Sequence, residues 1–227
     1  MKLSELRPCR LFLLDLDGTL IDSRADLTRA VDHMLARMHM RPLHILYVDD
    51  FVGNGVRPLI ERSLREVLGR DPESILIQEG IGLFKEEYGD HLLDQTRLYP
   101  NVKEGMDRLP WAKFALVSNK PESFSRRILE GLGIANRFSL ILGGDSIQKC
   151  KPDPEALFKA MDFCQSSPSE TAIVGDSAVD IRAGKAAGIT TCGVLGGFRP
   201  KEELEAAGCD IIIKTLLELA DHFRPPE

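Results

Sequence analysis

Residues 11–19 read Leu-Phe-Leu-Leu-Asp-Leu-Asp-Gly-Thr, an apolar run followed by two carboxylates and a glycine. Four consecutive apolar residues are typical of a strand buried on both faces of a parallel sheet. Open α/β sheets place their active sites at the carboxyl ends of such strands. Asp15 and Asp17, two residues apart, lie on one side of a strand that continues through them. Gly18 then allows the backbone to reverse.

Two carboxylates in a confined mouth repel each other unless a cation or a proton lies between them. A site built on Asp15 and Asp17 can therefore bind Mg²⁺ and attack a phosphorus atom. The same residues have a structural interpretation, because an Asp-Gly pair also closes a strand with an ordinary turn. Other parts of the chain must decide between these two interpretations.

Three other segments each carry one polar group at the end of an apolar run or in a loop. Ser118 follows the run 114–117, Asp176 follows Ile-Val-Gly, and Lys151 opens Lys-Pro-Asp-Pro. A phosphoryl-transfer site requires a nucleophile, groups that hold the phosphate, and positive charge. The combination favours the chemical interpretation of the first motif.

These motifs resemble those of the haloacid dehalogenase-like hydrolase superfamily, and the resemblance covers nearly the whole chain. Within the superfamily, the chain looks like the phosphoglycolate phosphatase branch. The matching stretches are Asp-Leu-Asp-Gly-Thr-Leu-Ile-Asp-Ser at 15–23, Val-Gly-Asn-Gly at 52–55, Val-Ser-Asn-Lys-Pro at 117–121 and Val-Gly-Asp-Ser-Ala-Val-Asp-Ile-Arg-Ala-Gly-Lys-Ala-Ala-Gly at 174–188. The core motifs are highly specific for the superfamily, whereas the sequence between the first two is only moderately specific for the branch.

The chain divides into two regions of different pattern. From 22 to 98 apolar residues recur at helical spacing, which predicts an all-helical insertion. From Tyr99 onward, short apolar runs alternate with amphipathic helices, which is typical of βαβ units. The sequence therefore predicts an α/β fold: a doubly wound, Rossmann-like parallel-sheet core at 1–21 and 99–227, interrupted by a helical domain at 22–98. The expected core strands after the first lie at 114–117, 139–142, 171–174, 190–195 and 210–213.

The insertion leaves directly after the first strand, so we expect it to lie over the active-site mouth as a lid that excludes water. The resemblance implies that it is a cap of the C1 type. Residues 21–24 and 98–101 are the expected hinges. A helix should begin near Pro72, but Gly80 and Gly82 make its middle doubtful.

The composition is ordinary for a soluble globular protein. The chain has 227 residues, of which 43% are hydrophobic, and a net charge of −6. Negative charge gives no reason to expect nucleic acid or an anionic membrane as partner. The run 11–14 is too short for a signal peptide, and no apolar run approaches the about 20 residues of a membrane span. Five cysteines without a Cys-x-x-Cys pair favour reduced thiols, so we expect a cytoplasmic protein. We expect either a monomer or a homodimer, because no sequence pattern distinguishes the two.

The catalytic assignments follow from the resemblance. Asp15 is the expected nucleophile, which attacks phosphorus and forms an aspartyl-phosphate. Asp17 is expected to protonate the leaving alcohol and then to take a proton from the attacking water. Lys151 would neutralise the nucleophile and the transferring phosphoryl group. Lys149 is a rival two residues away, but the Lys-Pro-Asp-Pro frame favours Lys151.

Further residues are expected to hold the phosphate. Backbone N–H groups of Gly18 and Thr19 can donate to its oxygens, as in an anion nest. The hydroxyl of Ser118 and the N–H of Asn119 are expected to hold another oxygen. A serine at a strand end is more often a turn former or a helix cap, so its register with Asp15 decides its role.

The expected cofactor is Mg²⁺. Mg²⁺ prefers oxygen ligands and keeps several waters. Asp15, Asp176 and the backbone carbonyl of Asp17 are the expected protein ligands. Asp180 is expected to stand behind them, where it orients Lys151 or a metal-bound water.

Substrate choice is expected to come from the insertion, because the core motifs only process the phosphate. The turn containing Asn54 and Gly55 should face the mouth, with Arg57 just inside the next helix. A helix N-terminus and an arginine suit a small carboxylate. Arg57 could equally be a solvated helix charge.

The resemblance implies Mg²⁺-dependent hydrolysis of a small phosphorylated metabolite, with 2-phosphoglycolate as the leading candidate. A sugar-phosphate phosphatase and a β-phosphoglucomutase-like mutase are alternatives, because one fold supports many functions and only the insertion distinguishes them. A non-catalytic binding module is a further alternative. The intact set of Asp15, Asp17, Lys151 and Asp176 argues against it.

Overall fold

A six-stranded parallel sheet forms the centre of the protein. The computed structural model describes residues 6–43 and 51–227. The strand order is β6-β5-β2-β7-β8-β9, and every neighbouring pair is parallel. The chain order reverses beside β2, so the carboxyl end of β2 lies at the switch point where such sheets bind ligands. The strands are β2 (Leu11–Leu14), β5 (Lys113–Val117), β6 (Phe138–Leu142), β7 (Thr171–Gly175), β8 (Thr190–Val194) and β9 (Ile211–Ile213).

The strand β2 is buried on both faces, as its sequence predicts. Leu11 and Leu13 belong to the apolar cluster of α7 and α8, whereas Phe12 and Leu14 belong to that of α5 and α6. Successive side chains of a strand alternate between faces, so one short run contributes to both cores. The core helices are α5 (Val102–Asp107), α6 (Glu122–Gly131), α7 (Glu155–Cys164), α8 (Ala178–Ala187) and α9 (Lys201–Ala206).

Short elements complete the core. The parallel pair β1 and β10 joins the two ends of the described chain. Within the described residues, three 3₁₀ helices connect or follow the main strands. The short elements are β1 (Arg7–Pro8), η2 (Ala135–Arg137), η3 (Pro168–Glu170), η4 (Leu216–Asp221) and β10 (Phe223–Arg224).

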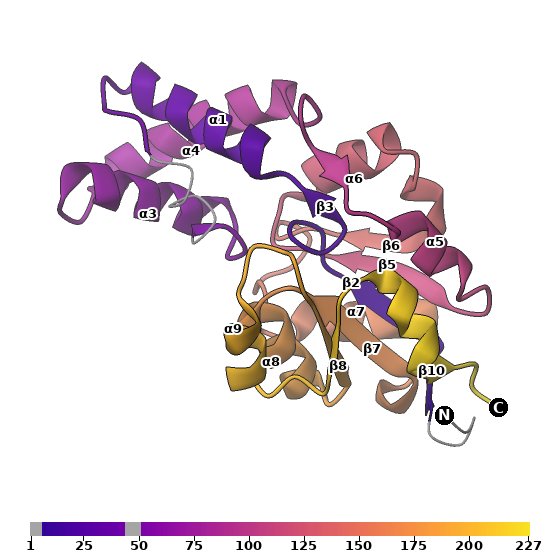
Figure 1. Ribbon diagram of the computed structural model, residues 1–227. Coiled ribbons are helices and arrows are strands. Elements are labelled where there is room, and N and C mark those ends of the chain that lie inside the picture. The colour runs from indigo at the N-terminus through magenta and orange to yellow at the C-terminus, as the bar shows by residue number, and fades with distance from the viewer. Residues whose placement is uncertain (1–5, 44–50) are drawn as a thin grey trace.

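Three described helices form the cap: α1 (Arg24–Arg37), α3 (Val56–Leu68) and α4 (Ser74–Asp90). The chain leaves the core through β3 (Ile21–Asp22) and returns through β4 (Arg97–Leu98), and these two strands pair antiparallel. Figure 1 shows the cap helices as a layer beside the sheet, joined to it next to β3. The predicted fold class is therefore confirmed, while the domain boundaries near 22 and 98 stay predictions. In the part of the chain that the structure describes, no helix is long and apolar enough to cross a membrane.

Helix α4 runs without a break through Gly80 and Gly82, so the doubt about its middle was unnecessary. Gly80 faces the other two cap helices. A Cβ atom there would lie 2.8 Å from Ile60 Cγ2 and 3.2 Å from Met34 Sδ. The absence of a side chain lets three helices approach closely, and this packing offsets the low helix propensity of glycine.

Alanine at Gly80 and alanine at Gly82, both in the middle of α4, should change stability in opposite directions. Gly80→Ala overpacks the contact with Ile60, and we expect a net loss of about 1 kcal/mol, because overpacking of ~1–3 kcal/mol exceeds the gain in helix propensity. Gly82→Ala is the matched control, since a Cβ there meets nothing within 4 Å. It should raise the free energy of unfolding by about 0.5–1 kcal/mol. Urea unfolding of both variants measures the difference, and equal stabilisation would refute the packing argument.

Candidate active site

The strand β2 delivers Asp15 and Asp17 to the carboxyl edge of the sheet. The N–H of Asp15 donates to the carbonyl of Val174 at 3.0 Å, so the pairing with β7 continues one residue past β2. The chain then turns back, because the N–H of Gly18 donates to the carbonyl of Ile21 at 2.9 Å. Gly18 has φ +83°, a conformation that residues with side chains rarely adopt.

Three carboxylates meet beneath the mouth. Asp15, Asp176 and Asp180 are buried, and one oxygen of each lies within 4.8 Å of the others. Burial, reinforced by the charge of Asp180 and opposed by Lys151, raises the pKa of Asp15 to about 7. Burial and the charges of Asp15 and Asp180 raise the pKa of Asp176 well above its ordinary value. Such crowding favours a bound cation or proton.

Lys151 supplies positive charge to this group. Its Nζ lies 2.8 Å from Asp15 Oδ1 and 2.6 Å from Asp180 Oδ1, and its side chain is buried. Burial alone would lower the pKa of Lys151, but the two carboxylates more than offset it and hold the pKa above its ordinary value. Lys149 is exposed and lies 3.8 Å from Asp153, away from the carboxylate group.

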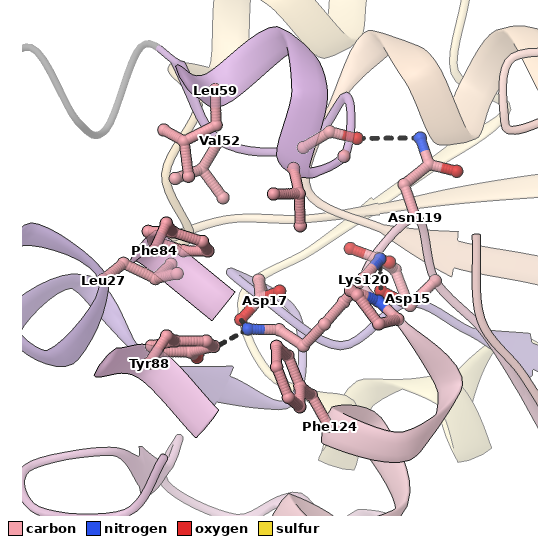
Figure 2. A pocket seen from close by; sticks show the side chains of 15 residues that line it. Asp15, Asp17, Leu27, Val52, Leu59, Phe84, Tyr88, Asn119, Lys120 and Phe124 are labelled. Carbon is pink, nitrogen blue, oxygen red and sulfur yellow. Dashed lines mark hydrogen bonds and ion pairs between the residues drawn. The ribbon is translucent and has the colours of Figure 1, made fainter. Parts of the chain in front are cut away.

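Asn119 fixes the backbone at Lys151. Its Oδ1 accepts from the N–H of Lys151, and its Nδ2 donates to the carbonyl of the same residue, both at 3.0 Å. The same Nδ2 donates to the carbonyl of Gly53 in the cap at 2.9 Å, as Figure 2 shows. The side chain of Asn119 thus connects two loops, a structural role that the sequence did not indicate.

Asp180 stands behind Lys151 at the start of α8. Its Oδ2 accepts from the hydroxyl of Ser177 at 2.7 Å and from the N–H of the same residue at 3.3 Å. Its Oδ1 contacts Lys151, so both oxygens have partners within the protein. The predicted role of Asp180, to orient Lys151 or a metal-bound water, stays a prediction.

Glycines surround Asp176. Its Oδ2 accepts from the N–H of Phe198 at 2.6 Å. A Cβ at Gly18 would lie 2.1 Å from Asp176 Oδ2, and one at Gly197 would lie 2.5 Å from the same atom. The carboxylate therefore occupies space that any side chain at these glycines would fill. Buried carboxylate oxygens of this kind suit a hard divalent cation, so the acidic triad fits a metal ion.

Asp17 has partners that sequence reasoning missed. Its Oδ1 accepts from Ser23 Oγ at 2.5 Å and lies 3.1 Å from Lys120 Nζ. Lys120 Nζ also donates to the hydroxyl of Tyr88 at 2.6 Å. A signal for Lys120 was available, because it directly follows Ser118 and Asn119 in a matched motif. No sequence signal pointed to Tyr88, which lies on a cap helix.

A cavity opens above these residues. Asp15, Asp17, Ser118, Asn119 and Lys120 form its core side (Figure 2). The cap side is mostly apolar. Its described lining consists of Leu27, Val52, Gly53, Gly55, Val56, Leu59, Phe84 and Tyr88, with Pro121 and Phe124 of the core beside them.

Several predicted residues lie elsewhere. Gly18 and Thr19 line a second cavity, and Thr19 Oγ1 is buried without a partner among the described atoms. Asn54 is half-buried and is not part of the first cavity's described lining, although its neighbour Gly55 is. Arg57 is exposed and does not line that cavity. The structure thus brings the core residues together but does not bring Arg57 to them.

Comparisons with known proteins agree with this geometry. The family model described as Haloacid dehalogenase-like hydrolase matches residues 12–194. A phosphoglycolate phosphatase of Neisseria meningitidis is 38% identical over 216 residues, which cover 93% of this chain and 92% of the relative. That of Nitrosospira multiformis is 33% identical over 213 residues, covering 93% and 94%. A crystal structure of a predicted phosphoglycolate phosphatase from Haemophilus somnus superposes with a TM-score of 0.88 at 28% identity, covering 94% of this chain and 97% of that one.

The matches span the sheet, the cap and every core motif, at identities and coverage that chance does not produce. The chain therefore belongs to the haloacid dehalogenase-like hydrolases.

Proposed function

We propose that this protein is a phosphatase that hydrolyses a small phosphomonoester, 2-phosphoglycolate, to glycolate and phosphate. The observation that carries the proposal is the ion pair between Lys151 and Asp15 at the carboxyl end of β2, 2.8 Å long and open to the cavity through Asp15. A buried carboxylate beside an ammonium is suited to attack phosphorus while the growing negative charge is neutralised.

The proposed reaction has two displacements. An oxygen of Asp15 bonds to phosphorus as the bond to the leaving oxygen breaks, and Asp17 gives its proton to that oxygen. Water then attacks the aspartyl-phosphate, and Asp17, now a carboxylate, takes the proton of the water. Phosphate leaves and Asp15 returns to its starting form. Lys151 stays close to Asp15 in both steps and offsets negative charge on the phosphoryl group.

We propose that the hydroxyl of Ser118 and the N–H of Asn119 hold the phosphate oxygens. The N–H groups of Gly18 and Thr19, which the sequence also offered, donate instead to the carbonyls of Ile21 and Leu16. Ser118 is buried and lines the cavity beside Asp15. Its Oγ accepts from the N–H of Lys120 at 3.3 Å, which fixes the loop after β5. Backbone donors of this kind stabilise negative charge without having to reorganise.

Mg²⁺ is the proposed metal. Asp15, Asp176 and the backbone carbonyl of Asp17 would hold it, and Asp180 would stay behind with Lys151. When bound, Mg²⁺ supplies positive charge that offsets the carboxylates and the transferring phosphate. The buried carboxylates of Asp15 and Asp176, which have oxygens within 4.8 Å of each other, and the glycines around Asp176 support this choice.

Metal binding should be visible as thermal stabilisation. At a Mg²⁺ concentration 100 times the Kd, stabilisation of about 2.7 kcal/mol is expected, or roughly 5–10 °C in Tm for a chain of this size. Asp176→Asn should lose most of this rise and, in EDTA, should be at least as stable as the wild type, because one of three crowded carboxylates is gone. Asp162→Asn, at an exposed position on α7, is the control. An unchanged Mg²⁺ effect in Asp176→Asn would exclude that residue as a ligand.

The substrate proposal rests on the named relatives and on the cavity. Among the described residues that line it, Lys120 carries the positive charge and the cap side is apolar. The space enclosed between the core and the cap is small, which suits a small leaving group. Recognition of the carboxylate by Arg57 stays a prediction without support from the lining. The described cap side offers the hydroxyl of Tyr88 as its polar side-chain group, so no observation favours a mutase that must bind a second sugar hydroxyl.

The test is phosphate release from a panel of phosphorylated metabolites with Mg²⁺ and with EDTA. We expect the highest kcat/KM for 2-phosphoglycolate and no release in EDTA. A higher kcat/KM for a sugar phosphate would support the proposed hydrolysis but reject 2-phosphoglycolate as the preferred substrate. Conversion of a sugar phosphate to an isomer, without release of free phosphate, would reject hydrolysis and identify the protein as a mutase.

A further inference from the structure

Lys120 is a buried cation at the contact between the core and the cap. It lies in the loop after β5, and its side chain is only 5% exposed. Its Nζ lies 3.1 Å from Asp17 Oδ1 and 2.6 Å from the hydroxyl of Tyr88, as Figure 2 shows. Burial alone would lower the pKa of Lys120, but Asp17 and Tyr88 more than offset this and raise it. Lys120 is therefore a charged group that joins the core acid to a cap residue.

Tyr88 is held firmly in the cap. It is 1% exposed, and its ring stacks on that of Phe84 with centroids 5.4 Å apart and an interplanar angle of 17°. Phe124 of the core helix α6 contacts the ring edge-on at 5.7 Å and 77°. Lys120 Nζ lies 4.4 Å from the ring centroid, within the range of a cation–π contact. Burial raises the pKa of Tyr88 to about 12, so its hydroxyl keeps its proton.

Asp17 is held on one side of its carboxylate. Among the described residues, both contacts, from Ser23 Oγ and from Lys120 Nζ, fall on Oδ1. Ser23 immediately precedes the first cap helix, α1. Oδ2 is thus the oxygen left for the leaving group of a substrate in the cavity. Proton transfer needs this oxygen within about 3 Å of its target, and a displacement of 1 Å is costly.

We propose that Lys120 is a positioning residue for Asp17. We further propose that Tyr88 holds Lys120 in place only when the cap is closed over the core. With the cap in place, Tyr88 holds the ammonium, the ammonium holds Oδ1 of Asp17, and Oδ2 faces the leaving oxygen. When the cap lifts, Lys120 loses Tyr88 and Asp17 loses a fixed partner. Efficient proton donation is thereby confined to the closed enzyme. This inference rests on the proposed phosphatase function.

Leaving-group dependence separates a positioning role from a merely structural one. The alkoxide that leaves n-propyl phosphate is strongly basic and needs a proton as it leaves. The p-nitrophenolate that leaves p-nitrophenyl phosphate is weakly basic and does not. For Lys120→Met we expect kcat to fall about 10²-fold on n-propyl phosphate and less than about threefold on p-nitrophenyl phosphate. Tyr88→Phe keeps the ring and removes the hydroxyl, and should show the same pattern with a loss of about tenfold.

The controls address folding and charge. Lys85→Met removes an exposed lysine from the same cap helix as Tyr88 and should leave both rates unchanged. Thermal unfolding of each variant checks the fold, and Tyr88→Phe tests the inference even if Lys120→Met does not fold. Equal losses on both esters would overturn the proposal. The same variants are assayed with 2-phosphoglycolate. A loss confined to that substrate would also overturn the proposal, because Lys120 would then bind the substrate carboxylate. If the wild type releases phosphate from none of these esters, the proposed function itself fails.

Discussion

Replacement of Asp15 by asparagine should lower kcat for phosphate release by at least about 10⁴-fold, because the variant lacks the proposed nucleophile and so cannot form the proposed aspartyl-phosphate. The amide keeps the shape of the side chain. Loss of the pair with Lys151 is offset in part by relief of the repulsion from Asp180, so the fold should persist.

Steady-state phosphate release measures kcat. In a second experiment, enzyme is mixed with substrate that carries a labelled phosphate and is quenched in acid, so that any label bound covalently to the protein can be detected. Wild-type protein should carry label that hydroxylamine removes, and Asp15→Asn should carry none. Asp162→Asn, an exposed carboxylate on α7, should behave as the wild type. Turnover by Asp15→Asn above about one hundredth of the wild-type rate would reject Asp15 as nucleophile.

Loss of Lys151 should have the largest effect on stability. Lys151→Met leaves Asp15 and Asp180 buried without their ammonium. Breaking a buried ion pair costs about 3–5 kcal/mol, which corresponds to a fall in Tm of roughly 10 °C or more for a chain of this size. Phosphate release should fall about 10²–10³-fold as well, since a charge that stabilises the transition state is gone.

Lys149→Met is a matched control for this effect, two residues away. Lys149 is exposed, and its contact with Asp153 spans 3.8 Å. Exposed pairs of this kind contribute about 0–1 kcal/mol, so the variant should keep its Tm within about 2–4 °C and its activity. Differential scanning calorimetry in EDTA compares the two variants. Similar unfolding temperatures would mean that Lys151 does not stabilise the carboxylate group.

The core of the site was predictable because its positions depend on local pattern. An apolar run that contributes to both faces of a sheet must end at its carboxyl edge, so the location of Asp15 followed from residues 11–14. The proline frame around Lys151 distinguished it from Lys149, and the structure places only Lys151 in the carboxylate group. The fold class followed from the change between helical and alternating patterns near Tyr99.

The remaining features depend on contacts between distant segments. Lys120 and Tyr88 are 32 residues apart, on a loop and a cap helix, and no local pattern indicates their meeting. The continuity of α4 through Gly80 depends on how closely three helices approach, which helix propensity does not describe. The side chain of Asn119 binds the carbonyls of two separate loops, although the sequence suggested a backbone contact to phosphate. Arg57 had the chemistry expected of a ligand, but its helix position leaves it exposed.

The two glycines around Asp176 offer a way to recognise inactive relatives. A chain could keep all its acidic residues and still lose its metal if position 18 or 197 acquired a side chain, because a Cβ at either place would lie within 2.5 Å of Asp176 Oδ2. The acidic motifs of such a chain would not reveal the loss. We therefore expect metal binding at the proposed site to depend on empty volume as well as on charge.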